Sequence, residues 1–210
     1  GQPADPEASL LTHIRQVTFT GRRAGEGYFS QDGSQLIFQS ERDADNPFFQ
    51  IYLMDLQTGD TQRVSPGYGK TTCAWIHPSG EKVLFASTHL DPHARDKQRQ
   101  ELELRATGKE QRYAWDYDEY FDIFETDRRG QQLKNLTHTR GYDAEASWSP
   151  DGKLIVFSSN RHAYTETLSE EAATLFAHDP GALLDLYLMN ANGTNVRRLT
   201  DTLGTDGGAF

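Results

Sequence analysis

The sequence predicts an all-β protein built from repeated units of four short antiparallel strands. One hairpin motif occurs three times, with its turn at residues 31–33, 78–80 and 150–152. A strand segment lies 13 positions before each turn, from Val17 to Ser30, from Val64 to His77 and from Leu136 to Ser149. A pattern that recurs with a fixed internal spacing indicates a repeat architecture in which every unit contains the same strands.

A second constant spacing joins the last two strands of each unit. Thirteen positions separate Ile51 from Val64, Ile123 from Leu136 and Leu186 from Leu199. The turns between them contain Thr58-Gly59, Arg129-Gly130 and Asn192-Gly193, which are typical of hairpins. Each unit therefore has strand A before the first turn, strand B after it, and then strands C and D.

The third hairpin carries the clearest local signal. Pro150 presets a φ angle that suits a turn, and Asp151-Gly152 supplies a polar residue followed by a permissive one. The flanking positions hold residue types that favour strands, namely Trp148, Ile155 and Phe157. The first motif has Gln31 in place of the proline, and the second has Ser79 in place of the aspartate.

The units differ in length only between strands B and C. Relative to the first unit, the second carries 25 additional residues there and the third carries 16. Ser169 followed by two glutamates is typical of a helix start, so a helix is expected in the third insertion, and the second is expected to be partly helical. Insertions on one side of a repeat array usually build its binding face.

Four-stranded units of about 40–50 residues are typical of the blades of a β-propeller. The third repeat reads Ser-Trp-Ser-Pro-Asp-Gly-Lys-Leu-Ile-Val-Phe, then Asp-Leu-Tyr-Leu-Met-Asn and Arg-Arg-Leu-Thr. From about Ile14 onward, the chain resembles the WD40-like PD40 repeats of TolB-type bacterial propellers. The resemblance implies a periplasmic or otherwise exported protein, and similar segments occur in larger proteins, some of which carry a metallopeptidase domain.

The ends of the chain are expected to hold parts of further blades. Residues 1–13 form a lead-in, and residues 14–18 match a strand D that has no A, B or C before it. Residues 205–210 resemble the approach to the third turn and would begin another strand A. The expected blades cover about 24–65, 71–137 and 143–200. Three blades do not close a ring, so the others would come from a longer gene product or a second copy.

Composition excludes several classes of function. The net charge is −10 and no basic stripe is present, which argues against nucleic-acid binding. No apolar run is long enough to span a membrane, and no signal peptide opens the chain. A single cysteine, Cys73, excludes an internal disulfide.

Strand A is innermost in a propeller, so its residues line the central channel. The alignment places Glu26 with Glu145 and Asp143 with Asp206. One interpretation is a ring of carboxylates at the channel mouth that binds a cation or a basic peptide end. The other is that these residues cap turns and bond to nearby backbone. Cys73 aligns with the two glutamates and is expected to be small and half-buried.

The second insertion contains a cluster of aromatic residues. Three of them are candidates for a recognition patch, namely Trp115, Tyr117 and Tyr120. The alternative is that they pack the insertion onto its own blade. In the same insertion, His89, Asp91 and His93 could place two imidazoles and a carboxylate near a metal ion, or simply form a polar loop. The sequence leaves the metal unknown.

The predicted function is binding of a protein or peptide through the loop face, without catalysis and without a cofactor. No nucleophile elbow and no His-Glu-x-x-His motif is present. The alternative is an accessory or gating propeller of a larger hydrolase, such as a peptidase, whose catalytic domain lies outside these residues. Both readings rest on the resemblance of the fold.

Overall fold

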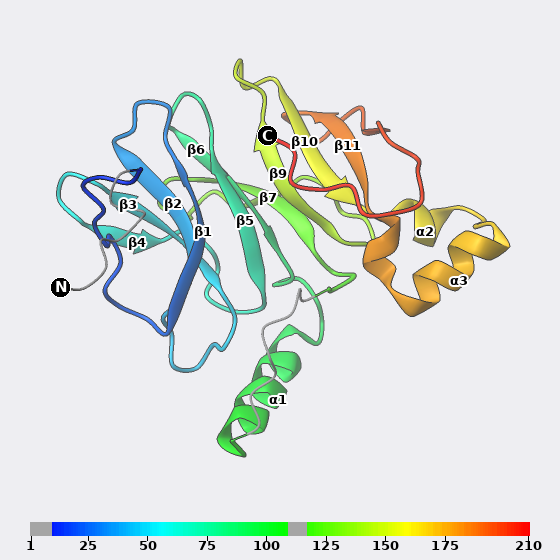
Figure 1. The fold of residues 1–210 in the computed structure, drawn as a ribbon, viewed down its shortest axis with the longest axis horizontal. Helices are drawn as coiled ribbons and strands as arrows, with labels where there is room; N and C mark the ends of the chain where they lie inside the picture. The colour runs from blue at the N-terminus through cyan, green and yellow to red at the C-terminus, as the bar shows by residue number, and fades with distance from the viewer. Residues whose placement is uncertain (1–9, 109–116) are drawn as a thin grey trace.

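The computed structural model describes residues 10–108 and 117–210 and contains three four-stranded antiparallel sheets in that part of the chain (Figure 1). Blade 1 comprises β1 (Arg23–Phe29), β2 (Gln35–Glu41), β3 (Gln50–Asp55) and β4 (Thr61–Arg63). Blade 2 comprises β5 (Thr71–Ile76), β6 (Lys82–Ser87), β7 (Asp122–Asp127) and β8 (Lys134–Asn135). Blade 3 comprises β9 (Asp143–Trp148), β10 (Leu154–Ser159), β11 (Asp185–Asn190) and β12 (Arg197–Arg198).

Within each blade the strands pair in chain order, so the predicted order of strands A, B, C and D is confirmed. The blades pack face to face. One apolar cluster joins blade 1 to blade 2 and includes Ile37, Ile51, Val83 and Phe85, all of them inaccessible to solvent. A second cluster joins blade 2 to blade 3 and includes Leu84, Ile123, Ile155 and Phe157. Burial of alternate strand residues between neighbouring sheets stabilises the arrangement.

The A–B turns explain why glycine recurs. At Gly33, Gly80 and Gly152 the backbone φ is 70–74°, a left-handed conformation that glycine adopts without steric cost. Each of these glycines donates its N–H to the carbonyl three residues earlier, at Ser30, His77 and Ser149. The predicted turns at 31–33, 78–80 and 150–152 are confirmed.

A repeated clasp holds strand D against strand C and accounts for the second constant spacing. In blade 2 the Thr137 hydroxyl donates to the Asp122 carboxylate over 2.7 Å and accepts the Ile123 N–H over 3.0 Å. Blade 1 repeats the clasp with Ser65 and Gln50, and blade 3 with Thr200 and Asp185. The serine or threonine after strand D therefore satisfies backbone and side-chain groups that would otherwise be buried without partners.

Each blade also contains a stacked aromatic pair across strands B and C. The pairs are Phe38–Tyr52, Phe85–Phe124 and Phe157–Tyr187, with ring centroids 5.7–6.2 Å apart. The residue four positions after the first ring covers each pair. Arg42 and Arg161 place their guanidinium groups over both rings of their pair, and the His89 ring lies tilted against Phe124, with the centroids 4.3 Å apart.

The two B–C insertions contain the helices. The second blade's insertion forms α1 (Ala94–Ala106), and the third blade's forms α2 (His162–Thr165), α3 (Glu170–His178) and the 3-10 helix η2 (Pro180–Leu183). Ser169 caps α3 by accepting the Ala172 N–H, as the sequence predicts. Helix α1 is anchored by Lys97, whose ammonium lies 2.7 Å from both Asp91 and Asp118. Among the described residues, no helix is long and apolar enough to cross a membrane.

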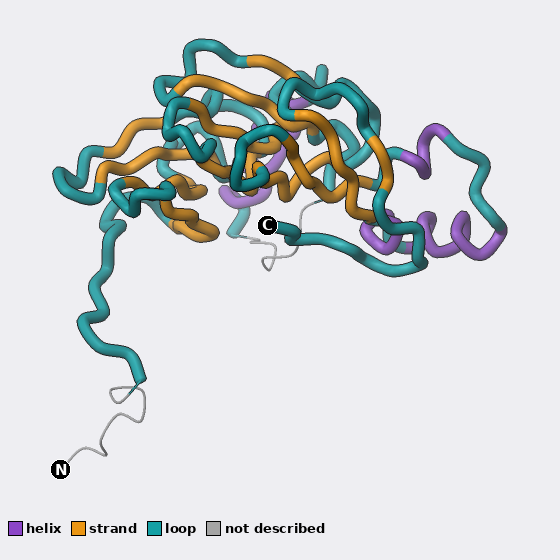
Figure 2. The backbone as a smooth tube through the Cα atoms, turned by 90° about the horizontal axis from the view of Figure 1, so that it is seen from above, coloured by secondary structure: helices purple, strands orange, loops and turns teal. Residues whose placement is uncertain are grey.

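Two expected strands are not formed. Residues 14–18 join no sheet, and Figure 2 shows the segment before β1 running away from the strands. Residues 205–210 are also not in a strand. The assignment of these segments to further blades stays a prediction, because a strand needs a hydrogen-bonded neighbour. Every described sheet already has its own inner and outer strand.

Candidate functional site

The innermost strand of each blade has a β-bulge at an equivalent residue. On β1, β5 and β9 the pairing with strand B shifts at a bulge. The bulge residues Glu26, Cys73 and Glu145 have φ values of 40°, 51° and 53°. Non-glycine residues seldom adopt this conformation. The extra residue of a bulge turns its side chain away from the regular alternation, and here it faces a pocket between the inner strands.

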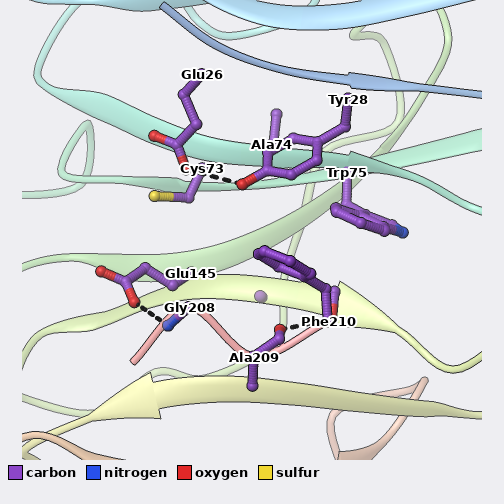
Figure 3. Close-up of a pocket in the computed structure, with 11 residues that line it drawn as sticks. Glu26, Tyr28, Cys73, Ala74, Trp75, Glu145, Gly208, Ala209 and Phe210 are labelled. Carbon is purple, nitrogen blue, oxygen red and sulfur yellow. Dashed lines mark hydrogen bonds between the residues drawn. The ribbon is translucent and has the colours of Figure 1, made fainter. Parts of the chain in front are cut away.

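This inner-strand pocket has a volume of about 210 Å³. Its lining consists of Glu26, Tyr28, Cys73, Ala74, Trp75, Glu145, Ala146, Ser147, Gly208, Ala209 and Phe210. Figure 3 shows the two carboxylates and the thiol at one side and the three aromatic rings at the other. The predicted meeting of Glu26 with Glu145, with Cys73 at the equivalent position, is thus found in the structure.

The aromatic wall comes from a second repeated position, two residues after the bulge. Tyr28, Trp75 and Phe210 occupy it, while blade 3 has Ser147 there. The centroids of Tyr28 and Trp75 are 4.5 Å apart, and Phe210 lies 5.8 Å from each. The segment after β12 brings Phe210 into this wall, since the Ser147 hydroxyl donates to the Ala209 carbonyl over 2.9 Å.

Hydrogen bonds fix the two carboxylates differently. Glu145 accepts the Gly208 N–H over 2.6 Å and the Ser158 hydroxyl over 3.1 Å. Glu26 accepts the Tyr28 hydroxyl over 3.3 Å. Burial, reinforced by the nearby Glu26 carboxylate, raises the pKa of the Tyr28 phenol and of the Cys73 thiol. Both groups are therefore neutral near pH 7, and the charge of the pocket comes from the glutamates.

The other two predicted channel carboxylates lie elsewhere. Asp143 is inaccessible to solvent and forms an ion pair of 2.6 Å with Arg161 inside blade 3. Burial raises the pKa of Asp143 to about 6, although Arg161 and the Ser159 hydroxyl oppose this shift. Asp206 donates its backbone N–H to the Leu184 carbonyl, and burial, with a smaller contribution from the Asp206 charge, raises the pKa of Asp185. The expected cluster of four carboxylates is not formed, because the bulge separates the side chain of Asp143 from that of Glu145.

The three aromatic candidates of the second insertion have different surroundings. Trp115 lies outside the described residues. Tyr120 is 40% exposed, with the Lys97 ammonium 5.3 Å from its ring. Tyr117 instead points between the insertions, where its hydroxyl lies 2.6 Å from that of Tyr164 and accepts a hydrogen bond from Asn160 over 2.9 Å. Tyr117 therefore joins the two insertions, and Tyr120 remains accessible.

The possible metal ligands of the second insertion do not converge. His89 is buried, its Nδ1 lies 2.9 Å from the Ser87 hydroxyl, and desolvation lowers its pKa to about 4. Asp91 is occupied by Lys97, and His93 is directed to Asp96, 3.9 Å away. In the described part of the chain, no group of three or more His, Cys, Asp or Glu side chains is arranged to hold a metal. Here His89 takes the place that arginine has in the other blades.

Sequence reasoning missed three features of these surroundings. They are the bulge, the aromatic position two residues beyond it, and the residue that covers each stacked pair. A signal for the second was present, because Tyr28, Trp75 and Phe210 each lie 11 positions after the matching residue of a strand D, namely Val17, Val64 and Leu199. No signal marks the bulge, since Glu26, Cys73 and Glu145 share no single residue type.

Comparisons with known proteins identify the fold. No family model matches the chain. The chain is 26% identical over 148 residues to the uncharacterized peptidase YuxL of Bacillus subtilis (strain 168), which is 66% of this chain and 22% of YuxL. The putative TolB of Agrobacterium tumefaciens superimposes with a TM-score of 0.59 at 22% identity, covering 91% of this chain and 53% of that one.

TolB of Acinetobacter baumannii gives a TM-score of 0.55 at 22% identity, over 89% of this chain and 34% of the other. The chain thus spans about half or less of each of these proteins. Identities of this size show the fold alone, and the repeated four-stranded sheets described above agree with it. The chain has a TolB-like β-propeller fold.

Proposed function

We propose that this chain is a non-enzymatic propeller module that binds a protein or peptide partner through the end of the blades that carries the two B–C insertions. The single observation that carries the proposal is the contact between these insertions. Tyr117 of the second and Tyr164 of the third meet at a hydroxyl–hydroxyl distance of 2.6 Å. Because the two insertions are in contact, they form one continuous surface across blades 2 and 3.

The composition of this surface suits recognition. Leu90 is 59% exposed and Tyr120 is 40% exposed, beside the long charged helix α1. Aromatic side chains are enriched at the centres of protein interfaces, and polar groups form their rims. The insertion loops are the part of the repeat that varies in length, and loops on a rigid scaffold commonly carry binding residues.

The test is site-specific photo-crosslinking in the full-length protein in its native cells. Tyr120→benzoyl-phenylalanine and the same replacement at Leu90 should crosslink to one common partner. The matched control is the replacement of Gln57, an exposed residue in the C–D turn of blade 1, at the opposite end of the strands. Equal crosslinking from Gln57, or none from either insertion position, would reject the proposal.

A second candidate is an accessory or gating propeller of a larger peptidase. The similarity to YuxL, named as a peptidase, favours it. Inside the described residues, the Ser–His pair of Ser87 and His89 is buried, which argues against a nucleophile there. Under this proposal the chain alone does not hydrolyse peptides, whereas the full-length protein does. Deleting the propeller would then change which peptide lengths are accepted. Turnover by the isolated chain would contradict both candidates.

We also propose that blade 3 packs against a further blade, supplied by a longer gene product or by a second copy. The face of blade 3 that points away from blade 2 carries Val156, Leu186 and Leu188, all only partly buried, and Leu199, which is 45% exposed. The resemblance to TolB-type propellers adds a periplasmic or otherwise exported location to the proposal. Fractionation of the native cells, with antibody detection, tests that location.

A further inference from the structure

The inner-strand pocket carries negative charge that nothing in the described chain neutralises. Its lining contains two glutamates and no lysine, arginine or histidine. Neither Glu26 nor Glu145 forms an ion pair within residues 10–108 and 117–210. Glu26 is exposed and Glu145 is partly buried, whereas the fully buried Asp143 and Asp118 are paired with Arg161 and Lys97. The pocket therefore has an electrostatic preference for a cation.

The opposite wall offers a second and independent attraction to positive charge. Tyr28, Trp75 and Phe210 form a cluster in which every pair of ring centroids is within 5.8 Å. The faces of aromatic rings attract ammonium and guanidinium groups, and tryptophan does so most strongly. An apolar wall of this kind also accepts the methylene stem of a long basic side chain.

The hydrogen-bonding capacity of the carboxylates is only partly used. An ionised carboxylate has about four acceptor sites. Glu26 accepts a hydrogen bond from the Tyr28 hydroxyl, and Glu145 accepts bonds from Gly208 and Ser158. The remaining acceptor sites suit groups with several N–H donors, of which guanidinium is the best match.

We propose that the inner-strand pocket binds the basic side chain of a peptide, with an arginine guanidinium or lysine ammonium between Glu26, Glu145 and the rings of Tyr28 and Trp75. The volume of about 210 Å³ supports a single side chain. Drug-sized ligands occupy pockets of about 300–1,000 Å³. A metal ion is a poorer fit, because no group of three suitable ligands is found among the described residues. The pocket is separate from the insertion surface, and this proposal stands without it.

The direct test compares two probes of nearly the same shape by isothermal titration calorimetry. N-acetyl-arginine amide carries a charged guanidinium, and N-acetyl-citrulline amide replaces it with a neutral urea. We expect the arginine probe to bind at least about tenfold more tightly, with an affinity that falls as salt is raised. Equal affinities, or no binding of the arginine probe in the millimolar range, would overturn the proposal.

A charge-matched pair of double variants locates the site. Glu26→Gln with Glu145→Gln should reduce the affinity for the arginine probe by at least about tenfold. Glu103→Gln with Glu171→Gln changes the net charge equally on exposed residues of α1 and α3 and should leave the affinity unchanged. Equal losses in both pairs would show a general charge effect and reject the site.

Two further measurements keep the proposal testable if the glutamate double variant misfolds. Phe210→Leu removes one ring from an exposed position and is expected to weaken binding about threefold without changing the circular dichroism spectrum. If the glutamate variant does not fold, the arginine–citrulline comparison on the unmodified protein still decides. Failure of the crosslinking test at the insertions would leave this result unaffected, so the two proposals fail separately.

Discussion

Blades 2 and 3 place equivalent residues in different surroundings. Leu136 follows strand D of blade 2 and is 5% exposed, whereas its counterpart in blade 3, Leu199, is 45% exposed. Leu84 of strand B is inaccessible, but the equivalent Val156 is only partly buried. The difference shows that one sequence pattern yields a core residue or a surface residue according to whether another sheet lies against it.

The largest expected effect comes from shortening these leucines. Leu136→Ala removes methyl groups from the packed interface between blades and should lower the free energy of unfolding by about 2–5 kcal/mol. Leu199→Ala should cost less than about 1 kcal/mol, because much of that side chain is already in water. Urea unfolding followed by circular dichroism gives both values. These values are expected for the isolated chain; a similar loss for the two variants would mean that a second copy covers Leu199 in solution, as the further blade proposed above would.

An intermediate effect is expected from the clasp between strands C and D. Thr137→Val leaves the Ile123 N–H without its acceptor and removes one of the donors to Asp122, which keeps those of Asn135 and Thr139, and should cost about 1–3 kcal/mol. Thr200→Val should cost less, since Thr200 is only partly buried and water can replace its hydroxyl. The same unfolding measurements apply, with Thr137→Ser as the control that keeps the hydroxyl. Destabilisation by the serine variant as large as by valine would remove the clasp as the cause.

The smallest net effect is the response of the unmodified protein to acid between pH 6.5 and pH 4. The pKa of His89 in blade 2 is about 4 in the folded state against an ordinary 6.5, so its contribution to stability is lost as the pH falls. The pKa of Asp143 in blade 3 is about 6 against an ordinary 3.8, so its contribution is lost as the pH rises through the same window. The two contributions oppose one another.

Single variants separate these contributions. His89→Gln should make the protein relatively more stable at pH 4.5 than at pH 7, compared with the unmodified protein. Asp143→Asn should do the reverse. Thermal melting at a series of pH values measures both, and the difference from the unmodified protein cancels the other titrating groups. Parallel pH profiles for all three proteins would show that neither group has the shifted pKa described here.

Much of the blade architecture could be predicted, because turn residues and strand spacing are local properties. Gly152, the clasp threonines and the Ser169 cap all act on neighbours within a few residues or one strand away. Whether residues 14–18 form a strand could not be predicted from local sequence, since strand pairing depends on a distant partner. The position of Asp143 could not be predicted either. The bulge at Glu145 reverses the alternation of side chains, and no sequence pattern indicates that bulge.

The bulge on the inner strands has a consequence for how this scaffold tolerates change. At that point the chain turns one side chain out of the alternation that fills the space between blades and towards the inner-strand pocket. Glutamate, cysteine and glutamate occupy the three equivalent bulges, although the flanking strands form the same pairs. Under the proposal above, substitutions at the exposed Glu26 and the partly buried Glu145 would change the ligand preference while the neighbouring core residues are left unaltered.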